Sequence, residues 1–222
     1  MKKLFIITLF VFSAPILAQS QQAYFQAGKS LSTFDYKNTK GEKLNNLFYS
    51  ANSFMSLGYR NGVLKPRLSG LIGLSLSGYG AVGSDNGNNN YMEWNLSYIG
   101  INVGLDYDVV EVRNTRIYLR GESSLSTLVQ GTQRLNDQIF RLSKTEEFKN
   151  PLINIKSGIG CAYAITRSIE FYAQYIFSKG VNMKSSNPEI EGEEALSIVS
   201  HNFGFGILLE LPTYPYKPPK YR

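Results

Sequence analysis

The chain offers few side chains that could act as a catalytic base or nucleophile, since it has one His and one Cys in 222 residues. A hydrolytic site needs a nucleophile and a base within hydrogen-bond reach of each other. Near His201, the candidate nucleophiles are Ser200 and Ser197. In an extended segment, Ser200 points to the opposite face, and Ser197 lies on the face of His201 but about two repeats away. This spacing does not favour a catalytic pair, so we expect no enzyme.

Metal and cofactor chemistry are equally poorly supported. One His and no Cys pair do not make a typical zinc site. A polar loop offers oxygen atoms that could bind calcium, at Asp85, Asn86, Asn88, Asn89 and Asn90. We interpret this loop as an ordinary solvated connection. Cys161 has no partner for an internal disulfide and follows an apolar pattern, so we interpret it as a small hydrophobic residue. No cofactor is expected.

The segments that carry these residues alternate in hydrophobicity with a period of two, which predicts β-strands. The last segment is the clearest. One face carries Val199, Phe203, Phe205, Ile207 and Leu209, and the other carries Ser200, Asn202, Gly204 and Gly206. Eight strands are predicted, at about 23–34, 48–60, 67–82, 93–110, 116–129, 152–165, 168–178 and 197–211.

The predicted connections alternate in length. Short ones fall near residues 61–66, 111–115 and 166–167, and long polar ones near 35–47, 83–92, 130–150 and 179–195. In an up-and-down meander, this alternation places every long loop at one end. Short periplasmic turns and long external loops are typical of outer-membrane barrels. We therefore predict an all-β fold, an eight-stranded antiparallel up-and-down transmembrane barrel.

The ends of the chain read as separate segments. Residues 1–18 are predicted to be a signal peptide, with Lys2 and Lys3 before an apolar stretch and Ala18 before the cut. No other stretch has 18 consecutive apolar residues, so no transmembrane helix is expected. Residues 19–211 are assigned to the barrel, and residues 212–222 to a Pro-rich periplasmic tail. The net charge of +6 is scattered, and we expect no nucleic-acid binding.

Alternation alone does not say which face is buried, because a soluble lipocalin-type barrel places its apolar residues inside. Here the less apolar face is rich in Gly and Ser, which suits the narrow interior of eight strands. That face also carries single polar or charged residues, which could pair inside a barrel. We predict a polar cluster in the lumen at Asp106, Arg120, Glu122, Lys156, Glu170 and Gln174, with Arg60 on the same face.

Aromatic residues gather near the predicted strand ends. Tyr59, Tyr107, Tyr118 and Tyr163 lie near the short turns, and Trp94 and Phe177 lie toward the long loops. Two aromatic girdles at the two membrane interfaces are expected of a membrane barrel. We therefore predict that these six side chains are interfacial, although aromatic residues also favour strands in general.

With these features, the chain resembles the small outer-membrane β-barrel proteins common in Bacteroidota, in the broad class of OmpA/OmpX-type barrels. The last strand looks like the C-terminal insertion signal of that class, at Asn202, Gly204, Ile207 and Leu209. The resemblance implies recognition by the barrel-assembly machinery and a surround of outer-membrane lipid. It places the protein in the outer membrane after export through the inner membrane.

Three functions follow as hypotheses. The first is a non-enzymatic outer-membrane barrel with a filled lumen, which supports the envelope or contacts a protein or surface ligand through its external loops. Aromatic residues near those loops are Tyr91, Trp94, Phe140 and Phe148. The second is a soluble periplasmic barrel that binds an apolar ligand. The third is a lipid A-modifying membrane enzyme, although barrels of the deacylase type carry His and Ser two residues apart on one face.

Overall fold

The computed structural model describes residues 21–37, 46–63, 67–85, 90–136, 138–142, 151–182 and 195–212. The predicted signal peptide and the tail after Pro212 lie outside the described residues. The same holds for Asn86, Asn88 and Asn89 of the polar loop and for Phe148. No helix in the described part of the chain is long and apolar enough to cross a membrane.

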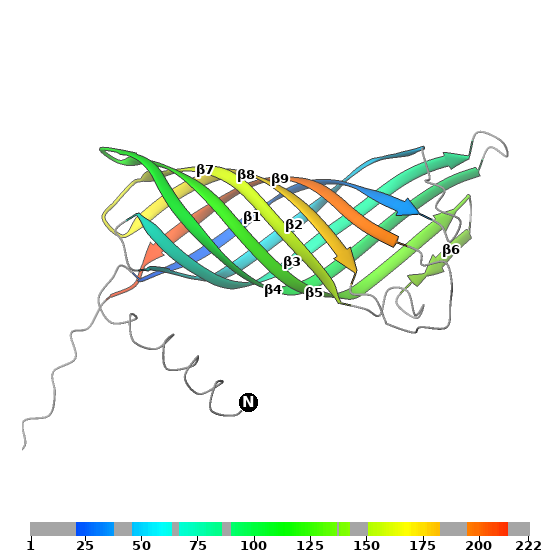
Figure 1. Cartoon of the computed structure of the whole chain (residues 1–222), viewed down its shortest axis with the longest axis horizontal. Coiled ribbons are helices and arrows are strands. Elements are labelled where there is room, and N and C mark those ends of the chain that lie inside the picture. The colour runs from blue at the N-terminus through cyan, green and yellow to red at the C-terminus, as the bar shows by residue number, and fades with distance from the viewer. Residues whose placement is uncertain are drawn as a thin grey trace, which may run out of the picture.

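The described residues form one closed antiparallel barrel (Figure 1). Its strands are β1 (Gln21–Lys37), β2 (Leu47–Gly62), β3 (Leu68–Asp85), β4 (Asn90–Val112), β5 (Thr115–Leu135), β7 (Leu152–Ala164), β8 (Ile169–Asn182) and β9 (Ala195–Glu210). Each strand pairs with its neighbours in the chain, and β1 pairs with β9. Pairing of β4 with β5 completes the ring, so the predicted eight-stranded up-and-down topology is confirmed.

Strand β6 (Gln138–Arg141) was not predicted. It pairs only with the end of β5, beside the long-loop end of the barrel (Figure 1). The predicted loops 83–92 and 130–150 were too long, because β4 and β5 continue their pairing as far as Met92 and Leu135. A strand of four residues is too short for an alternating pattern to be recognised. The polar composition near the ends of β4 and β5 concealed the extra length of these two strands.

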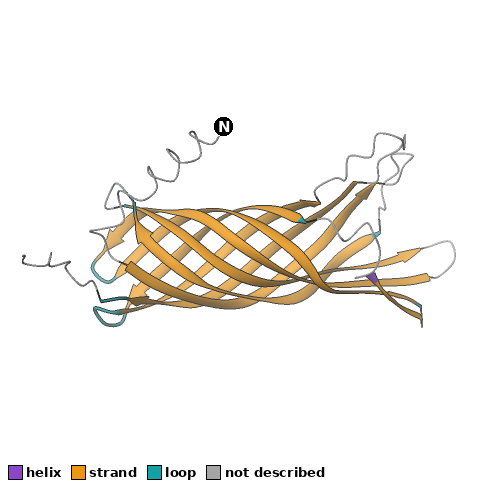
Figure 2. Cartoon of the chain, turned by 90° about the horizontal axis from the view of Figure 1, so that it is seen from below, coloured by secondary structure: helices purple, strands orange, loops and turns teal. Residues whose placement is uncertain are grey.

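The barrel is strongly sheared. A line of paired residues that leaves β1 at Thr33 and passes through β9, β8, β7, β5, β4, β3 and β2 returns to β1 at Ala23, ten residues away. Eight strands with this stagger tilt by roughly 40° from the barrel axis. Figure 2 shows the tilt and the extension of the sheet at one end. The turns 113–114 and 165–168 define the short-turn end, where β2 ends and β3 begins, and the opposite end is the long-loop end.

The two faces of the sheet have opposite character. Outward side chains are mostly apolar, and Phe205 on β9 is 71% exposed. Inward side chains are mostly Ser, Asn, Gln, Tyr and paired charges. Inward glycines make room for large neighbours, since a Cβ at Gly160 would collide with the ring of Tyr118 and one at Gly206 with the ring of Tyr172. A soluble barrel for an apolar ligand requires the apolar face inside, and the structure has the reverse arrangement.

Candidate functional site

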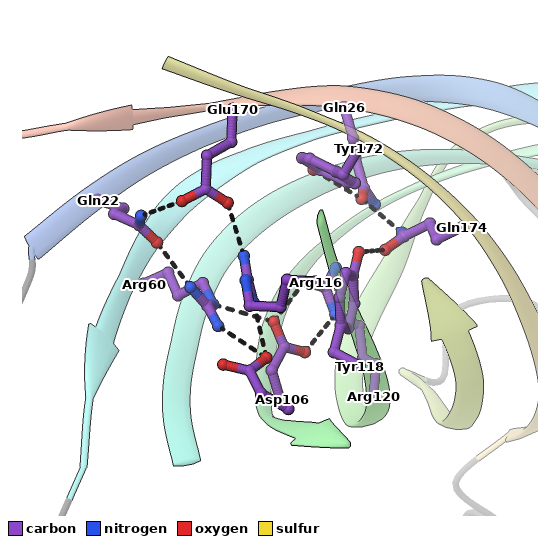
Figure 3. A network of polar contacts seen from close by, with 11 residues as sticks. Gln22, Gln26, Arg60, Asp106, Arg116, Tyr118, Arg120, Glu170, Tyr172 and Gln174 are labelled. Carbon is purple, nitrogen blue, oxygen red and sulfur yellow. Dashed lines mark hydrogen bonds and ion pairs between the residues drawn. The ribbon is translucent and has the colours of Figure 1, made fainter. Parts of the chain in front are cut away.

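Asp106 on β4 is the centre of an ionic network inside the short-turn end (Figure 3). Its carboxylate accepts two hydrogen bonds from Arg120 on β5, with Nε–Oδ1 2.7 Å and Nη2–Oδ2 2.8 Å. Arg60 on β2 donates a third, with Nε–Oδ2 3.1 Å. The Asp106 side chain is 1% exposed, so these contacts replace its hydration. The network ties three strands together across the interior.

A second group lies nearer to the short turns and joins the network to the other side of the barrel. Arg116 bridges two carboxylates, with Nη1–Asp108 Oδ1 2.7 Å and Nη2–Glu170 Oε2 2.8 Å. Gln22 accepts a hydrogen bond of 2.6 Å from Arg60 Nη1 and donates one of 3.3 Å to Glu170. Charged and amide groups from β1, β2, β4, β5 and β8 therefore close this end of the lumen.

Tyr118 corrects one prediction. It was expected at the membrane interface, but it is 1% exposed and points into the lumen, because it lies on the same strand face as Arg120. Its hydroxyl donates to Gln174 Oε1 over 3.0 Å, and Gln174 Nε2 donates to Gln26 Oε1 over 2.6 Å. The guanidinium of Arg120 lies 5.3 Å from the centre of the Tyr118 ring. Tyr118 is thus part of the interior network (Figure 3).

The six residues of the predicted lumen cluster all lie inside, but in separate groups. Asp106 and Arg120 pair directly, and Glu170 joins them through Arg116 and Gln22. Lys156 and Glu122 form their own pair at 2.7 Å, with both side chains largely buried. Other members of the network were not predicted, among them Arg116, Asp108, Gln22 and Gln26. Arg116 shares the face of Arg120 and could have been found from the alternation, whereas Gln22 precedes the predicted start of the first strand.

A belt of small polar residues lies beside the Lys156–Glu122 pair in the lumen. It contains a small cavity, on the scale of a water molecule rather than a channel. Lining residues from the belt include Ser56, Ser75, Ser77, Asn102 and Asn202. Ser75 donates to Asn102 Oδ1 over 2.9 Å.

The long-loop end of the lumen is filled by an apolar cluster. Its buried members are Phe34, Tyr79, Ala81, Leu96, Tyr98, Leu142, Leu152 and Ile198. Trp94 packs partly against this cluster, and its ring lies 6.1 Å from that of Phe34 in an edge arrangement. The prediction of Trp94 as an interfacial residue is therefore wrong, because its side chain lies on the inward face of β4. Together with the ionic network, the cluster closes both ends of the interior.

The other predicted interfacial aromatics lie on the outward face: Tyr59 is half-buried, and Tyr107, Tyr163 and Phe177 are exposed. In the predicted insertion signal, Asn202 and Gly204 lie on the inward face of β9, and Ile207 and Leu209 on the outward face. Asn202 donates hydrogen bonds to the Ile176 carbonyl and to Ser200 Oγ, each over 3.1 Å. Recognition of this segment by an assembly machinery stays a prediction.

His201 is not paired with a nucleophile among the described residues. Its Nδ1 lies 2.7 Å from the Tyr175 hydroxyl on the outward face. Ser200 points inward, where its hydroxyl lies 3.0 Å from that of Ser178. Cys161 is free and exposed on β7. In the described part of the chain, no group of three or more His, Cys, Asp or Glu side chains could hold a metal ion.

Comparison with known proteins shows the fold alone. No protein-family model matches the chain, and no curated protein matches it. Neisserial surface protein A is 14% identical, with 85% of this chain and 97% of that chain covered and a TM-score of 0.47. The outer membrane protein OprG from Pseudomonas aeruginosa is 10% identical, with 89% and 100% covered and a TM-score of 0.50. The outer membrane protease OmpT from Escherichia coli is 10% identical, with 88% and 99% covered and a TM-score of 0.47. The chain has the outer-membrane β-barrel fold.

Proposed function

We propose that the protein is an integral outer-membrane barrel without catalytic activity, which contacts a protein or surface ligand through the structure above its outer rim. The observation that carries the proposal is that side chains fill the interior, from the ionic network at one end to the apolar cluster at the other. At the long-loop end, the edge of strand β6 is exposed. A packed lumen leaves no route for a solute of useful size, and the outward apolar band is covered by lipid. The part of the sheet that extends beyond the apolar band at the long-loop end is therefore the surface that can contact a partner.

The extension is built from the ends of β4 and β5 and from β6. On β4 the outward apolar run ends at Ile99, yet pairing with β5 continues to Met92. Strand β6 adds to this ribbon, and no described strand pairs with its other edge. It exposes Ile139 and Phe140, which are 70% and 45% exposed. Apolar side chains beside a free strand edge favour contact with another chain or surface.

The absence of catalysis is proposed from the surroundings of His201. Its ring nitrogen contacts a tyrosine hydroxyl, and the neighbouring serine points to the opposite face. A lipid A-modifying enzyme remains the alternative to test. If His201→Ala leaves the mass spectrum of cellular lipid A unchanged, the proposal stands. A mass difference that the wild-type protein restores would overturn it.

Location and orientation are tested by labelling single cysteines with a membrane-impermeant maleimide. In a Cys161→Ser background, Phe140→Cys reports on the extension, and Arg167→Cys is the matched control at the short-turn end. We expect Phe140→Cys to react on intact cells and Arg167→Cys only after the outer membrane is permeabilised. Equal reaction of both, or recovery of the protein in the soluble periplasmic fraction, would contradict the proposal.

The proposal also includes export of the protein with a cleaved signal peptide and its relationship to other outer-membrane barrels. Cleavage of a signal peptide before Gln19 is tested by N-terminal sequencing of the protein from the membrane fraction. Placement among the Bacteroidota-type barrels stays a prediction from the sequence, because no family model matches.

A further inference from the structure

His201 sits on the outside of the barrel among aromatic rings. The centres of the Phe177 and Tyr49 rings lie 5.4 Å and 5.7 Å from that of His201, and the Tyr175 ring stacks on it at 6.1 Å. One imidazole nitrogen is held by the Tyr175 hydroxyl at 2.7 Å. The other nitrogen forms no hydrogen bond within the described residues. A fixed imidazole with a free nitrogen is a hydrogen-bonding group offered to the outside of the barrel.

Two lysines flank His201 on the neighbouring strands, and both are exposed on the outward face. On β9, His201 pairs with Leu31 of β1 and with Phe177 of β8. Lys29 and Lys179 each lie two residues along from these partners, so each is a diagonal neighbour of His201. Diagonal neighbours in a sheet are separated by about 7–8 Å between Cα atoms. Long lysine side chains can therefore reach the space in front of the imidazole.

The three groups lie almost level in the barrel. Following paired residues from β1 through β9 to β8 moves toward the short-turn end by about one residue per strand, because of the shear. The diagonal from Lys29 through His201 to Lys179 steps two residues the other way on each strand, so neighbouring groups differ in height by only about one residue. The groups therefore form a row that runs around the barrel.

The row lies at the border of the apolar band. At the same height on β3 and β4, the outward apolar run ends at Leu76 and Ile99, where Gly78 and Ser97 follow. The outward positions described there on β2, β3, β4, β5 and β7 carry no charge. The two lysines and the imidazole are thus confined to β1, β9 and β8, at the height where lipid headgroups meet acyl chains.

Neither lysine has a carboxylate partner in the described part of the chain. Lys29 Nζ donates to Ser53 Oγ over 3.0 Å, and Lys179 has no ion pair there. A charged lysine at the edge of a lipid-facing surface is costly unless it reaches the headgroups or an opposite charge. Below the row, Phe203 and Phe205 provide an outward apolar surface for acyl chains.

We propose that Lys29, His201 and Lys179 bind the phosphorylated headgroup of a lipid in the leaflet next to the long-loop end. The lysines neutralise the phosphate, the imidazole donates a hydrogen bond, and the acyl chains lie along the apolar strand faces below. The inference rests on the proposed membrane location, but not on the proposed contacts of β6.

The test uses the full barrel chain refolded in neutral detergent, with bound lipid counted by native mass spectrometry. The probes are phosphorylated lipid A and the same lipid after enzymatic removal of its phosphates. We expect the double variant Lys29→Gln, Lys179→Gln to bind phosphorylated lipid at least tenfold more weakly than wild type, and to bind the dephosphorylated lipid unchanged. Inorganic phosphate at equal concentration should not displace the lipid, because it lacks the acyl contacts. Displacement would overturn the assignment to a lipid in favour of a phosphate site.

The matched control is the double variant Arg113→Gln, Arg167→Gln, which removes the same charge from exposed positions at the short-turn end. It should bind like wild type. An equal loss of lipid binding in both double variants, or no loss of lipid binding in the lysine variant, would overturn the proposed site. Gel mobility of the heated and unheated samples separates the two proposals. Absence of a shift refutes the membrane barrel, whereas a shift without phosphate-dependent binding refutes only the lipid site.

Discussion

Arg120 holds Asp106 through two parallel hydrogen bonds, of 2.7 Å and 2.8 Å, in a part of the lumen from which solvent is almost excluded. A bidentate pair of this kind fixes both side chains and the register of their strands. Arg60 shares the same carboxylate at 3.1 Å. Asp106 is therefore the anion on which two buried guanidinium groups depend.

Asp106→Asn should destabilise the barrel by about 3–5 kcal/mol, because it leaves the buried Arg120 without its counter-ion and leaves Arg60 only the longer contact of 3.7 Å with Asp108. The midpoint of urea unfolding in detergent, followed by gel mobility, measures the loss. Glu111→Gln is the control, since Glu111 lies on the same strand and is exposed. A similar loss of stability in both variants would show that the ion pairs of Asp106 are not the cause of the destabilisation.

Gly160→Ala should destabilise the barrel by about 1–3 kcal/mol, because the added methyl group overlaps the Tyr118 ring. The measurement is the same urea midpoint. Gly121→Ala is a close control, because a Cβ there meets nothing within 4 Å. Further replacement of Tyr118 by Leu in the Gly160→Ala chain should restore part of the loss, and no restoration would contradict the steric explanation.

Phe205→Arg should destabilise the barrel by about 2–4 kcal/mol in a lipid bilayer, since an arginine on the lipid face is costly at mid-depth. In a water-soluble barrel, the same change at so exposed a position would be nearly neutral. Unfolding in vesicles measures the difference. Ile139→Arg on β6 is the control beyond the apolar band, and it should leave barrel stability unchanged. A neutral Phe205→Arg would argue against lipid contact.

The wild-type barrel should give no steady conductance in a planar bilayer, because its lumen is closed by the ionic network and the apolar cluster. Replacing Leu96 and Tyr98 by Ala should lower stability by several kcal/mol through the cavities it creates, yet still give no steady conductance, because the ionic network stays in place. Discrete, sizeable current steps in the wild type would show that the packed interior is not the state in a membrane.

The alternation of residues such as Ile99, Ile101 and Val103 was enough to predict the strands, their up-and-down order and the polar character of one face. It also placed Asp106 and Arg120 on that face. Alternation does not distinguish the lumen from the rim, however, and Tyr118 and Trp94 were assigned to the interface from their nearness to strand ends. Tyr118 lies two residues from Arg120, and Trp94 lies two residues from Leu96. Because successive side chains in a strand point to opposite faces, this spacing was the better guide to the inward position of both aromatic side chains.

Which partners meet inside the barrel was decided by tertiary structure. Ion pairs such as Arg116–Glu170 and hydrogen bonds such as Gln174–Gln26 join strands far apart in the chain. Their meeting depends on the stagger of ten residues around the ring, which no local pattern encodes. The sequence by itself determined that the chain forms a barrel of alternating strands, since side-chain direction in a strand is a local property. Only closure of the sheet decided which charges pair, which end is sealed by apolar residues, and which outward groups share one height.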